Sequence, residues 1–401
     1  MNKRIMILGA SILQLPAIKK AKELGLNVIV VDMNPNAIGF KEDGVICEVI
    51  STIDTEKVLE CAKKYKINGI MTLASDMPMR TVAVVSNAMG LVGPTEETAL
   101  KATNKAAMRV ALKKHGVPIP MFYCISTREE FLSAVRKIRS GGYKCIVKPA
   151  DNSGSRGINL LEDYSDKNVN AAFDYSKKYS HSGEVMVEEF MEGPEVSVET
   201  LSIQGVCHVI QITDKLTSGV PFFVEMGHSQ PSLLESNVQE KIRQVTIAAN
   251  SAIGIKNGPS HTEIKVTKEG PKVVELGARL GGDNITTHLV PFSTGVDMVE
   301  CCIRIALGEQ PEYISKYNKA SAIRYFETSE GYIKDIVGMD TAEQIPGIKQ
   351  VSIVHGAGYH AGIIKNSIDR VGFVIAQSDT VENAVESCNK AMKVIKIVYN
   401  S

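Results

Sequence analysis

Residues 261–282 read HTEIKVTKEGPKVVELGARLGG, and two apolar runs in this stretch predict a β-hairpin. The runs flank residues 268–270, KEG, in which glycine suits the positive φ of a three-residue loop. With the turn centred on residue 269, Glu263 is expected directly opposite Glu275. Opposed positions on one face bring side chains to roughly 5 Å, where like charges repel each other unless something neutralises them.

A divalent cation would neutralise the two carboxylates. Mg²⁺ takes oxygen ligands, commonly one or two carboxylates together with substrate phosphates. The same residues also suit a solvated hairpin face that carries Glu263, Lys265 and Glu275. The hairpin alone leaves both interpretations open.

The composition of the 401-residue chain is that of an ordinary globular protein with several subdomains. The 45 Lys and Arg residues balance 45 Asp and Glu residues, so no basic field would attract nucleic acid or an anionic membrane. Trp is absent, which disfavours a base-stacking platform. The eight cysteines form no C-x-x-C pair, which argues against a zinc knuckle or a redox dithiol. We expect reduced cysteines in a cytoplasmic protein.

The first residues, MNKRIMILGASILQLPAI, resemble a signal peptide because cations precede an apolar segment. However, Lys19, Lys20 and Lys22 continue a helical pattern without an A-x-A site, and a second apolar strand follows. No run reaches the 18 or so apolar residues that span a bilayer. These features predict a cytoplasmic location and no membrane partner.

A parallel β-α-β unit is predicted for residues 5–31, and Asp32 ends its second strand as in dinucleotide-binding domains. Positions 9, 11 and 14 are Gly, Ser and Gln, however, where that fingerprint has three glycines. We therefore expect no NAD binding. The pattern continues to about residue 95 with helix 55–65, strand 69–73 and helix 78–89.

Residues 145–161, CIVKPADNSGSRGINLL, predict two strands joined by a loop rich in Gly and Ser. Such a loop presents backbone N–H groups to an anion, and Lys148 on the first strand adds a positive charge beside it. No G-K-[ST] follows, so this is not a Walker A loop. A flexible hairpin tip with an incidental Arg156 would also account for the pattern. Before these strands, polar residues 103–105 head a helix.

Strands dominate the second half of the chain. Within residues 184–201 an acidic connection joins two strands, and the second strand alternates Val196 and Val198 with Glu195, Ser197 and Glu199. Further strands are predicted within 206–224 and 258–277, with helix 235–253 between them and an apolar helix over 286–307. Strands near 322–327, 350–355 and 370–376, helix 380–392 and a last strand predict a C-terminal α+β domain.

The order of these features closely resembles the ATP-grasp family of carboxylate–amine ligases over essentially the whole chain. The order is a helix with Lys105, a strand with Lys148, a glycine loop, an acidic hinge and the paired glutamates followed by Arg279. The motifs HTEIKV and VELGARLGG are most similar to the branch of L-amino-acid ligases, which join two amino acids.

The resemblance implies a fold of mixed α/β and α+β class with three domains. These would be a preATP-grasp Rossmann-like domain over 1–95, an ATP-grasp domain over 96–310 and a small C-terminal α+β lid domain over 320–401. Within the ATP-grasp domain, an ATP subdomain would cover about 118–190, and a metal and substrate subdomain would cover about 191–310.

The resemblance also implies a nucleotide site built from the lysines, the glycine loop and the hinge. The residues that would hold the phosphates are Lys105, Lys148, Ser153, Gly154, Ser155 and Gly157. The residues that match positions near adenine and ribose are Glu188, Glu189, Met191 and Glu195.

Glu263 and Glu275 match the family's Mg²⁺ ligands, with Mn²⁺ as an alternative ion. Arg279 matches the arginine that steadies the transferred phosphoryl group, and Lys148 would assist it in catalysis. Many members have Asn two residues after the second metal glutamate as a further ligand, whereas this chain has Gly277. The number of metal ions therefore stays open, although amino-acid ligases share this form.

Glu225 and His228 lie in the segment FFVEMGHSQPSLL, as in the ligase branch, where the pair lies by the amino-acid pocket. Glu225 would bind an ammonium group, and His228 would polarise the carboxylate or orient the second amine. A loop acid and a helix-capping histidine would explain the same spacing. Asp283 and Asn284 are positioned to set the selectivity of the pocket.

The implied function is ATP-dependent ligation. A carboxylate, expected to be that of an amino acid, would become an acyl-phosphate and then an amide or peptide, with release of ADP and phosphate. The partners would be a small-molecule carboxylate and a small-molecule amine, and homodimers are common in such ligases.

Two alternatives stay open. One is a purine-pathway-like or biotin-carboxylase-like enzyme that uses bicarbonate or a ribonucleotide. The other is an inactive ATP-binding regulatory module, against which the joint presence of Lys148, Glu263, Glu275 and Arg279 argues.

Overall fold

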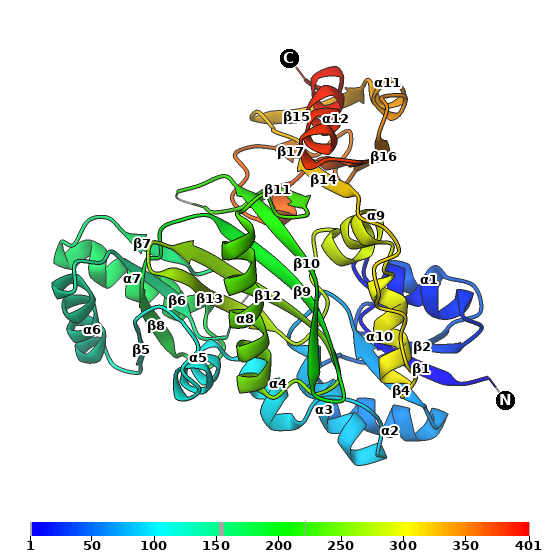
Figure 1. Ribbon diagram of the computed structural model, residues 1–401, viewed down its shortest axis with the longest axis horizontal. Coiled ribbons are helices and arrows are strands. Elements are labelled where there is room, and N and C mark those ends of the chain that lie inside the picture. The colour runs from blue at the N-terminus through cyan, green and yellow to red at the C-terminus, as the bar shows by residue number, and fades with distance from the viewer. Residues whose placement is uncertain (1, 152–155, 221, 401) are drawn as a thin grey trace.

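The computed structural model describes residues 2–151, 156–220 and 222–400 (Figure 1). The chain begins with a parallel four-stranded sheet in the order β3-β2-β1-β4. Its strands and helices are β1 (Arg4–Leu8), α1 (Leu15–Glu23), β2 (Asn27–Asp32), β3 (Ile46–Val49), α2 (Thr55–Tyr65), β4 (Gly69–Thr72) and α3 (Pro78–Met89), with a 3₁₀ turn at Ile38–Lys41. The predicted parallel β-α-β opening is confirmed.

Alternating side chains of β1 pack on opposite faces of this sheet, because a parallel sheet is normally covered on both sides. Ile5 and Ile7 pack with α1 and with α10 (Met298–Ala306), whereas Met6 and Leu8 pack with α2 and α3. A helix from much later in the chain thus covers part of the first sheet, which fixes the first unit against the rest of the molecule.

Two capped helices lead from the first sheet to the nucleotide region. The Thr95 side chain accepts from the Thr98 N–H at the start of α4 (Glu96–Thr103). The Asn104 side chain accepts from the Ala107 N–H at the start of α5 (Lys105–Lys114). The predicted helix start near residues 103–105 is confirmed, and it places Lys105 at the first position of α5.

A small antiparallel sheet, in the order β5-β8-β6-β7, carries Lys148 and the hinge glutamates. Phe131 and Phe173 from its two helices pack against its apolar face, with their ring centroids 5.0 Å apart. The elements are β5 (Phe122–Ile125), α6 (Arg128–Ser140), β6 (Cys145–Pro149), β7 (Asn159–Leu161), α7 (Asp166–Tyr179) and β8 (Val185–Glu189).

An eight-stranded antiparallel sheet, in the order β13-β12-β9-β10-β11-β14-β18-β16, forms the centre of the molecule. Its strands are β9 (Glu195–Ile203), β10 (Val206–Thr217), β11 (Glu225–Gln230), β12 (Gly258–Thr267), β13 (Gly270–Gly277), β14 (Ala320–Tyr325), β16 (Ile348–Ile353) and β18 (Gly372–Ser378). Helix α8 (Ser236–Ile253) packs on the β9 to β13 part. The sheet is continuous from β11 to β14, so the C-terminal α+β part shares its strands with the central part. The predicted domain boundaries stay predictions.

The C-terminal part is completed by α12 and a small second sheet. Cys388 and Ala384 of α12 pack against β14 and β18 in one apolar cluster. The remaining elements are β15 (Gly331–Val337), α11 (Met339–Glu343), β17 (His360–Ala361), a 3₁₀ turn at Ser367–Asp369, α12 (Val381–Val394) and β19 (Lys396–Tyr399).

The predicted single helix over 286–307 is wrong, because three short helical pieces occupy this region. A π-helical turn (Ile285–Leu289) and α9 (Val290–Thr294) come first, and α10 follows. Gly295 ends α9 with φ +76°, and the Asp297 side chain caps α10 by accepting from the Glu300 N–H. The breaks allow α10 to pack under the first sheet while the preceding pieces stay near β14.

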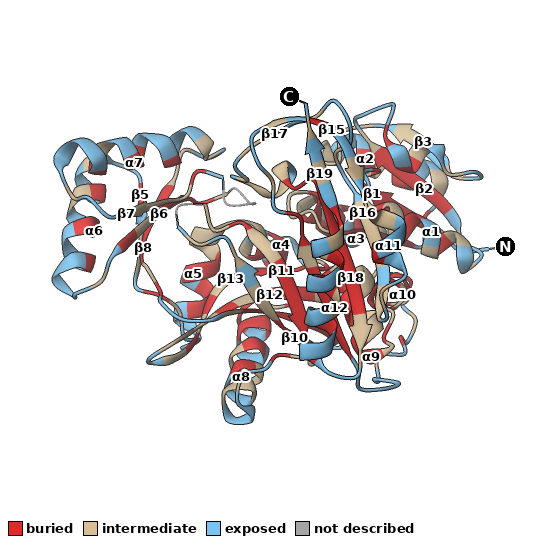
Figure 2. Cartoon of the chain, turned by 90° about the horizontal axis from the view of Figure 1, so that it is seen from above, coloured by how far each residue is buried: buried red, intermediate tan, exposed pale blue. Residues whose placement is uncertain are grey.

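The burial pattern follows the two-sided packing of the sheets (Figure 2). Strands such as β2, β8 and β18 are largely buried, whereas the outer faces of α6, α7 and α12 are exposed. Among the described residues, no helix has both the length and the apolar character needed to cross a membrane.

Gly193 lets the hinge between β8 and β9 lie against the β12–β13 hairpin. Its φ is +135°, and an added Cβ would lie 2.0 Å from the Val266 carbonyl oxygen. We expect Gly193→Ala to lower the free energy of unfolding by more than about 2 kcal/mol, because the carbonyl is backbone and cannot move aside alone. Gly142→Ala is the control, since Gly142 has φ +84° but no atom within 4 Å of an added Cβ.

The control should cost only the roughly 1 kcal/mol of a left-handed non-glycine residue. Urea or thermal unfolding of both variants measures the difference. Equal destabilisation of the two variants would contradict the close approach of hinge and hairpin.

Candidate active site

Glu263 and Glu275 lie directly opposite each other in the β12–β13 hairpin, as predicted. The predicted three-residue loop is wrong, because Thr267 pairs with Gly270 and only residues 268 and 269 form the loop. That loop alone would set Glu263 opposite residue 274. A bulge at Val274 shifts the register by one residue and restores the glutamate pair. The two departures from the expected geometry compensate each other.

Each of the opposed glutamates has its own cation. Lys105 Nζ lies 2.6 Å from Glu275 Oε1, and Lys215 Nζ lies 3.2 Å from Glu263 Oε1. His261 Nε2 adds a longer contact to Glu263 at 3.6 Å. Burial raises the pKa of Glu263, but Lys215 and His261 outweigh burial and hold the pKa well below its usual range. Glu263 is therefore prepared as an anionic oxygen ligand, and Glu275 is held in place by its contact with Lys105.

The chemistry of this pair fits Mg²⁺. Two carboxylates on neighbouring strands provide hard oxygen ligands, and both side chains remain partly exposed to one cleft. Among the described residues, no group of three or more His, Cys, Asp or Glu side chains is arranged to hold a metal ion. Two carboxylates alone suit an ion that also takes phosphate oxygens and water as ligands.

One pocket brings together most of the residues that the sequence predicts. Nine of the predicted nucleotide, metal and substrate residues line it: Lys105, Lys148, Glu188, Glu189, Met191, Glu195, Glu225, Glu263 and Glu275. Ser153, Gly154 and Ser155 lie outside the described residues. Among the described ones, the pocket lining does not include Gly157, His228, Arg279 and Asp283.

Gly157 is buried against α7. Its φ is +82°, and an added Cβ would lie 2.7 Å from Tyr179 Cβ, while its carbonyl accepts from Ser176 Oγ at 2.6 Å. The glycine thus provides a close approach between the loop and α7. Its predicted contact with phosphate stays a prediction.

Lys148 is held in the pocket by a buried ion pair. Its Nζ lies 2.6 Å from Glu188 Oε2, and Arg109 Nε donates to Glu188 Oε1 at 2.7 Å. Burial raises the pKa of Glu188, but Arg109 and Lys148 outweigh burial and lower it to about 2. Burial lowers the pKa of Lys148, and Glu188 opposes that shift. Arg109 also donates to the carbonyl of the bulged Val274 at 2.7 Å, which ties this pair to the hairpin.

At the hinge, the Glu189 carboxylate pairs with Lys272 at 2.7 Å, and the backbone N–H of Glu189 donates to the Met121 carbonyl. Met191 is buried beside it. The side chain of Glu189 therefore joins the hinge to β13, and the predicted backbone contacts of Glu189 and Met191 with the adenine ring stay predictions.

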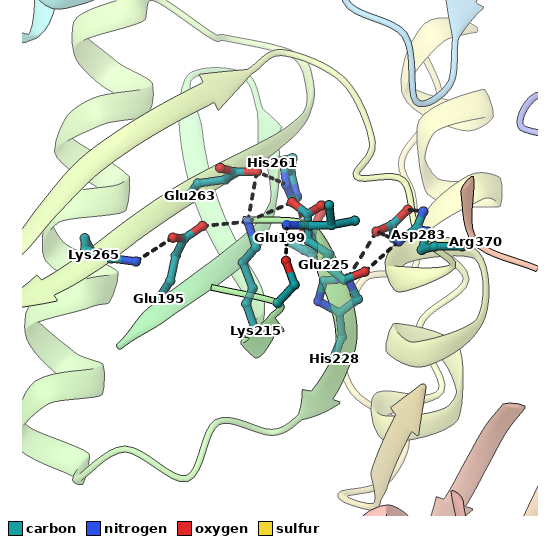
Figure 3. A network of polar contacts seen from close by, with 12 residues as sticks. Glu195, Glu199, Lys215, Glu225, His228, His261, Glu263, Lys265, Asp283 and Arg370 are labelled. Carbon is teal, nitrogen blue, oxygen red and sulfur yellow. Dashed lines mark hydrogen bonds and ion pairs between the residues drawn. The ribbon is translucent and has the colours of Figure 1, made fainter. Parts of the chain in front are cut away.

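Lys215 lies at the centre of a charged cluster that sequence analysis missed (Figure 3). Its Nζ on β10 lies 2.7 Å from Glu195 on β9, 3.4 Å from Glu225 on β11 and 3.2 Å from Glu263 on β12, one strand beyond β9. Burial lowers the pKa of Lys215, but these carboxylates outweigh burial and raise it well above its usual range. Lys265 pairs with the other oxygen of Glu195 at 2.8 Å.

Strand alternation had already placed Lys265 on the face of Glu263, and it could have found Lys215 as well. Lys215 is three residues from the buried Ile212 on β10 and so lies on the opposite face. The alternation of β9 had already put Glu195 and Glu199 on one face. Arg109, on an ordinary amphipathic helix, carried no comparable signal.

His228, which pairs with Lys215 across β10 and β11, lies together with Asp283 and Arg370 (Figure 3). Arg370 donates to both oxygens of Asp283, at 2.8 and 2.7 Å, and to the Glu225 carbonyl at 3.0 Å. Its guanidinium also lies 3.8 Å from the Tyr325 ring centroid. His228 Nε2 is 3.4 Å from Asp283 Oδ2. The predicted role of Glu225 and His228 at a substrate pocket stays a prediction, and motif reasoning missed Arg370 and Tyr325 beside them.

Of the two predicted catalytic residues, Lys148 lines the pocket and Arg279 does not. Its guanidinium pairs with Asp76 of the first unit, with Nε to Oδ1 at 2.8 Å. Its other close charges include Glu275, so Arg279 stands beside one of the two predicted metal ligands but outside the pocket lining.

Comparison with known proteins agrees with this geometry. Residues 141–287 match the ATP-grasp domain, and residues 324–400 match the L-amino acid ligase C-terminal domain 2. Over 337 residues the chain is 30% identical to the uncharacterized protein y4rH of Sinorhizobium fredii, which covers 81% of this chain and 68% of that protein. This chain belongs to the ATP-grasp family.

Two further relatives of this ATP-grasp protein have named activities. It is 27% identical over 317 residues to the L-arginine-specific L-amino acid ligase of Bacillus subtilis, covering 77% of this chain and 74% of that one. The crystal structure of L-amino acid ligase from Bacillus licheniformis has the same fold, with a TM-score of 0.85 and 24% identity over 100% of this chain and 99% of that one. The protein is an ADP-forming carbon–nitrogen ligase that uses ATP and Mg²⁺.

The Glu188 pair predicts a specific dependence of stability on pH. The pKa of Glu188 is lowered from 4.5 to about 2, so its stabilisation is complete above pH 4.5 and is lost as the pH falls toward 2. We expect Glu188→Gln to destabilise the protein by a few kcal/mol at pH 7, because Arg109 and Lys148 lose their anion. The difference in free energy of unfolding between Glu188→Gln and the original protein should be about 1 kcal/mol smaller at pH 3.5 than at pH 7.

Thermal unfolding at the two pH values measures this narrowing. Glu386→Gln is the matched control, because Glu386 pairs with Lys390 on an exposed helix face. A difference for Glu188→Gln that stays constant between pH 7 and 3.5 would contradict the charged pair.

Proposed function

We propose that this ligase activates the carboxylate of an amino acid and joins it to the amine of a second amino acid or a related amine. The observation that carries this choice is the match of residues 324–400 to the L-amino acid ligase C-terminal domain. In support, Arg370 of that region reaches Asp283 and the Glu225 carbonyl beside the pocket. The C-terminal region would therefore help to form the amino-acid site.

The first step would join a carboxylate oxygen to the γ-phosphorus of ATP, with ADP as the leaving group. Mg²⁺, when bound, offsets the charge that spreads over the phosphoryl oxygens. Lys105, Lys148 and Lys215 would surround the phosphates with fixed positive charge, and Arg279, which interacts with Glu275, would face the transferred group. Because each cation is already paired, little reorganisation would be needed when the nucleotide binds.

The second step would join the amine nitrogen to the acyl carbon, with phosphate as the leaving group and a proton lost from nitrogen. The protein would contribute by orienting the amine and by excluding water from the acyl-phosphate. Glu225, whose side chain is 26% exposed, is placed to bind an ammonium group of one substrate. His228 is buried against Asp283 and would instead orient that site.

The cellular setting completes the proposal. All eight cysteines are unpaired, which agrees with a reducing compartment, and we propose a cytoplasmic enzyme. A homodimer is proposed from the resemblance to related ligases.

A screen for ADP release over pairs of amino acids tests the proposal. We expect one or a few pairs to raise ADP release at least about 10-fold over ATP alone, with a product mass equal to the sum of the two amino acids minus water. Bicarbonate and ribonucleotides form the comparison arm, and stimulation by them alone would overturn the choice of substrate.

Two hairpin variants give the screen its internal control. Glu275→Gln should reduce ADP release by 100-fold or more, roughly the loss of one charge-stabilising group. Glu269→Gln, in the exposed loop of the same hairpin, should leave it unchanged. Full activity of Glu275→Gln would overturn the metal site.

A further inference from the structure

Arg279 is held by a carboxylate from the other end of the chain. Arg279 Nε lies 2.8 Å from Asp76 Oδ1, and its Nη2 lies 3.3 Å from Asp76 Oδ2. Both side chains are mostly buried, at 15% and 17% exposure. A two-point pair of this kind fixes both the position and the plane of a guanidinium. A third contact, from Nη1 to the Leu280 carbonyl at 3.3 Å, uses one more of its five N–H groups.

The position of Asp76 depends on an unusual turn. Asp76 follows β4, and two residues earlier Ala74 has φ +56°, a conformation that costs a non-glycine residue about 1 kcal/mol or more. Helix α3 begins directly afterwards, with the Met79 N–H donating to the Asp76 carbonyl at 2.9 Å. Strain kept at the end of a parallel strand, where α/β sheets place their sites, points to a functional constraint on this turn.

Gln14 holds that turn in place. Its Nε2 donates to the Leu73 carbonyl at 2.6 Å and to Ser75 Oγ at 3.3 Å, and its Oε1 accepts from Ser11 Oγ at 2.7 Å. Gly9 is needed for this arrangement, because a Cβ there would lie 2.8 Å from the Gln14 side chain. The Gly, Ser and Gln at positions 9, 11 and 14, which depart from the dinucleotide fingerprint, therefore serve to position the Asp76 turn.

Gly277 provides the space for Asp76. A Cβ at residue 277 would lie 3.0 Å from Asp76 Oδ1 and 3.3 Å from the Arg279 guanidinium. A longer side chain at this position would occupy the place of the Asp76 carboxylate. Three separate features, at Gln14, Ala74 and Gly277, thus converge on one ion pair.

The pair is also electrostatically suited to remain ionised. Burial raises the pKa of Asp76, but Arg279 outweighs burial and holds it below its usual range. Burial lowers the pKa of Arg279, and Asp76 outweighs that effect. Removing one partner would leave a buried, uncompensated charge.

We propose that Asp76 is a positioning residue that fixes the guanidinium of Arg279 for phosphoryl transfer, and that presenting it is a principal role of the first parallel sheet. This inference rests on the proposed function, because it takes Arg279 as the arginine that contacts the transferred phosphoryl group. The first parallel sheet would then contribute to turnover without binding a dinucleotide.

Chemical rescue tests the proposal with the full-length enzyme. Arg279→Ala should lose activity, and added guanidinium ion should restore part of it, because Asp76 would anchor the ion at the vacated position. In the double variant Arg279→Ala, Asp76→Asn, the same guanidinium concentration should restore at least about 10-fold less activity. A merely structural salt bridge would give no such dependence on Asp76.

Steady-state kinetics of single variants provide a second readout. Asp76→Asn should lower kcat about 10- to 100-fold with the KM for ATP nearly unchanged, and Asp76→Glu should recover part of the loss. Gly277→Ala, which leaves residue 76 unchanged but displaces its carboxylate, should lower kcat in the same way. Glu309→Gln is the matched control, since Glu309 pairs with Lys3 and Arg304 between the same parts of the molecule but away from the site.

The outcomes separate this inference from the function on which it rests. If Arg279→Ala keeps full activity, both the role of Arg279 and this inference are overturned. If Arg279→Ala is inactive but Asp76→Asn has full kcat, or rescue is equal in both backgrounds, the inference alone is overturned. The inference would also be overturned if Asp76→Asn lost kcat only in proportion to its loss of stability, in the same proportion as Glu309→Gln.

Discussion

The active site depends on keeping two carboxylates, Glu263 and Glu275, opposite each other on one hairpin. Two like charges about 5 Å apart repel by roughly 3 kcal/mol at an effective dielectric constant of 20. The protein offsets this repulsion with one lysine for each glutamate, Lys215 on β10 of the same sheet and Lys105 at the start of a helix. A bound divalent ion would share this task, which explains why both carboxylates still face the cleft.

The same rule of paired charges extends through the whole site. Lys148 is held by Glu188, Lys265 by Glu195, and Arg279 by Asp76, each within 2.8 Å. The anions come from the hinge, the central sheet and the first parallel sheet, so separate parts of the chain each fix one cation. Prearranged charge of this kind stabilises a developing phosphoryl charge without reorganisation at the moment of reaction.

Sequence reasoning recovered the parts of the fold that local patterns encode. The β-α-β opening, the strand with Lys148, the acidic hinge and the glutamate register all follow from apolar periodicity and motif spacing. The predicted register was correct although the predicted loop was wrong, because the bulge at Val274 compensates for the shorter loop. The Val274 carbonyl accepts from Arg109, a tertiary contact that local patterns do not reveal. The broken helix at Gly295 was missed because apolar content continued across the break.

The missed site residues share one cause. Asp76 and Arg370 lie about 200 and 90 residues from the partners they bind, in segments with no motif of their own. Only tertiary structure brings them to Arg279 and Asp283. Lys215 differs, because strand alternation carried its signal and could have been used.

The most direct test of the glutamate pair is a titration of Mn²⁺ binding in the presence of ADP. The electron paramagnetic resonance signal of free Mn²⁺ measures how much of the ion is bound. The account predicts that ADP promotes Mn²⁺ binding to the original protein and that this effect is lost when both Glu263 and Glu275 are changed to Gln. ADP without metal should still bind to both proteins. Equal ADP-dependent Mn²⁺ binding by the two proteins would contradict the account.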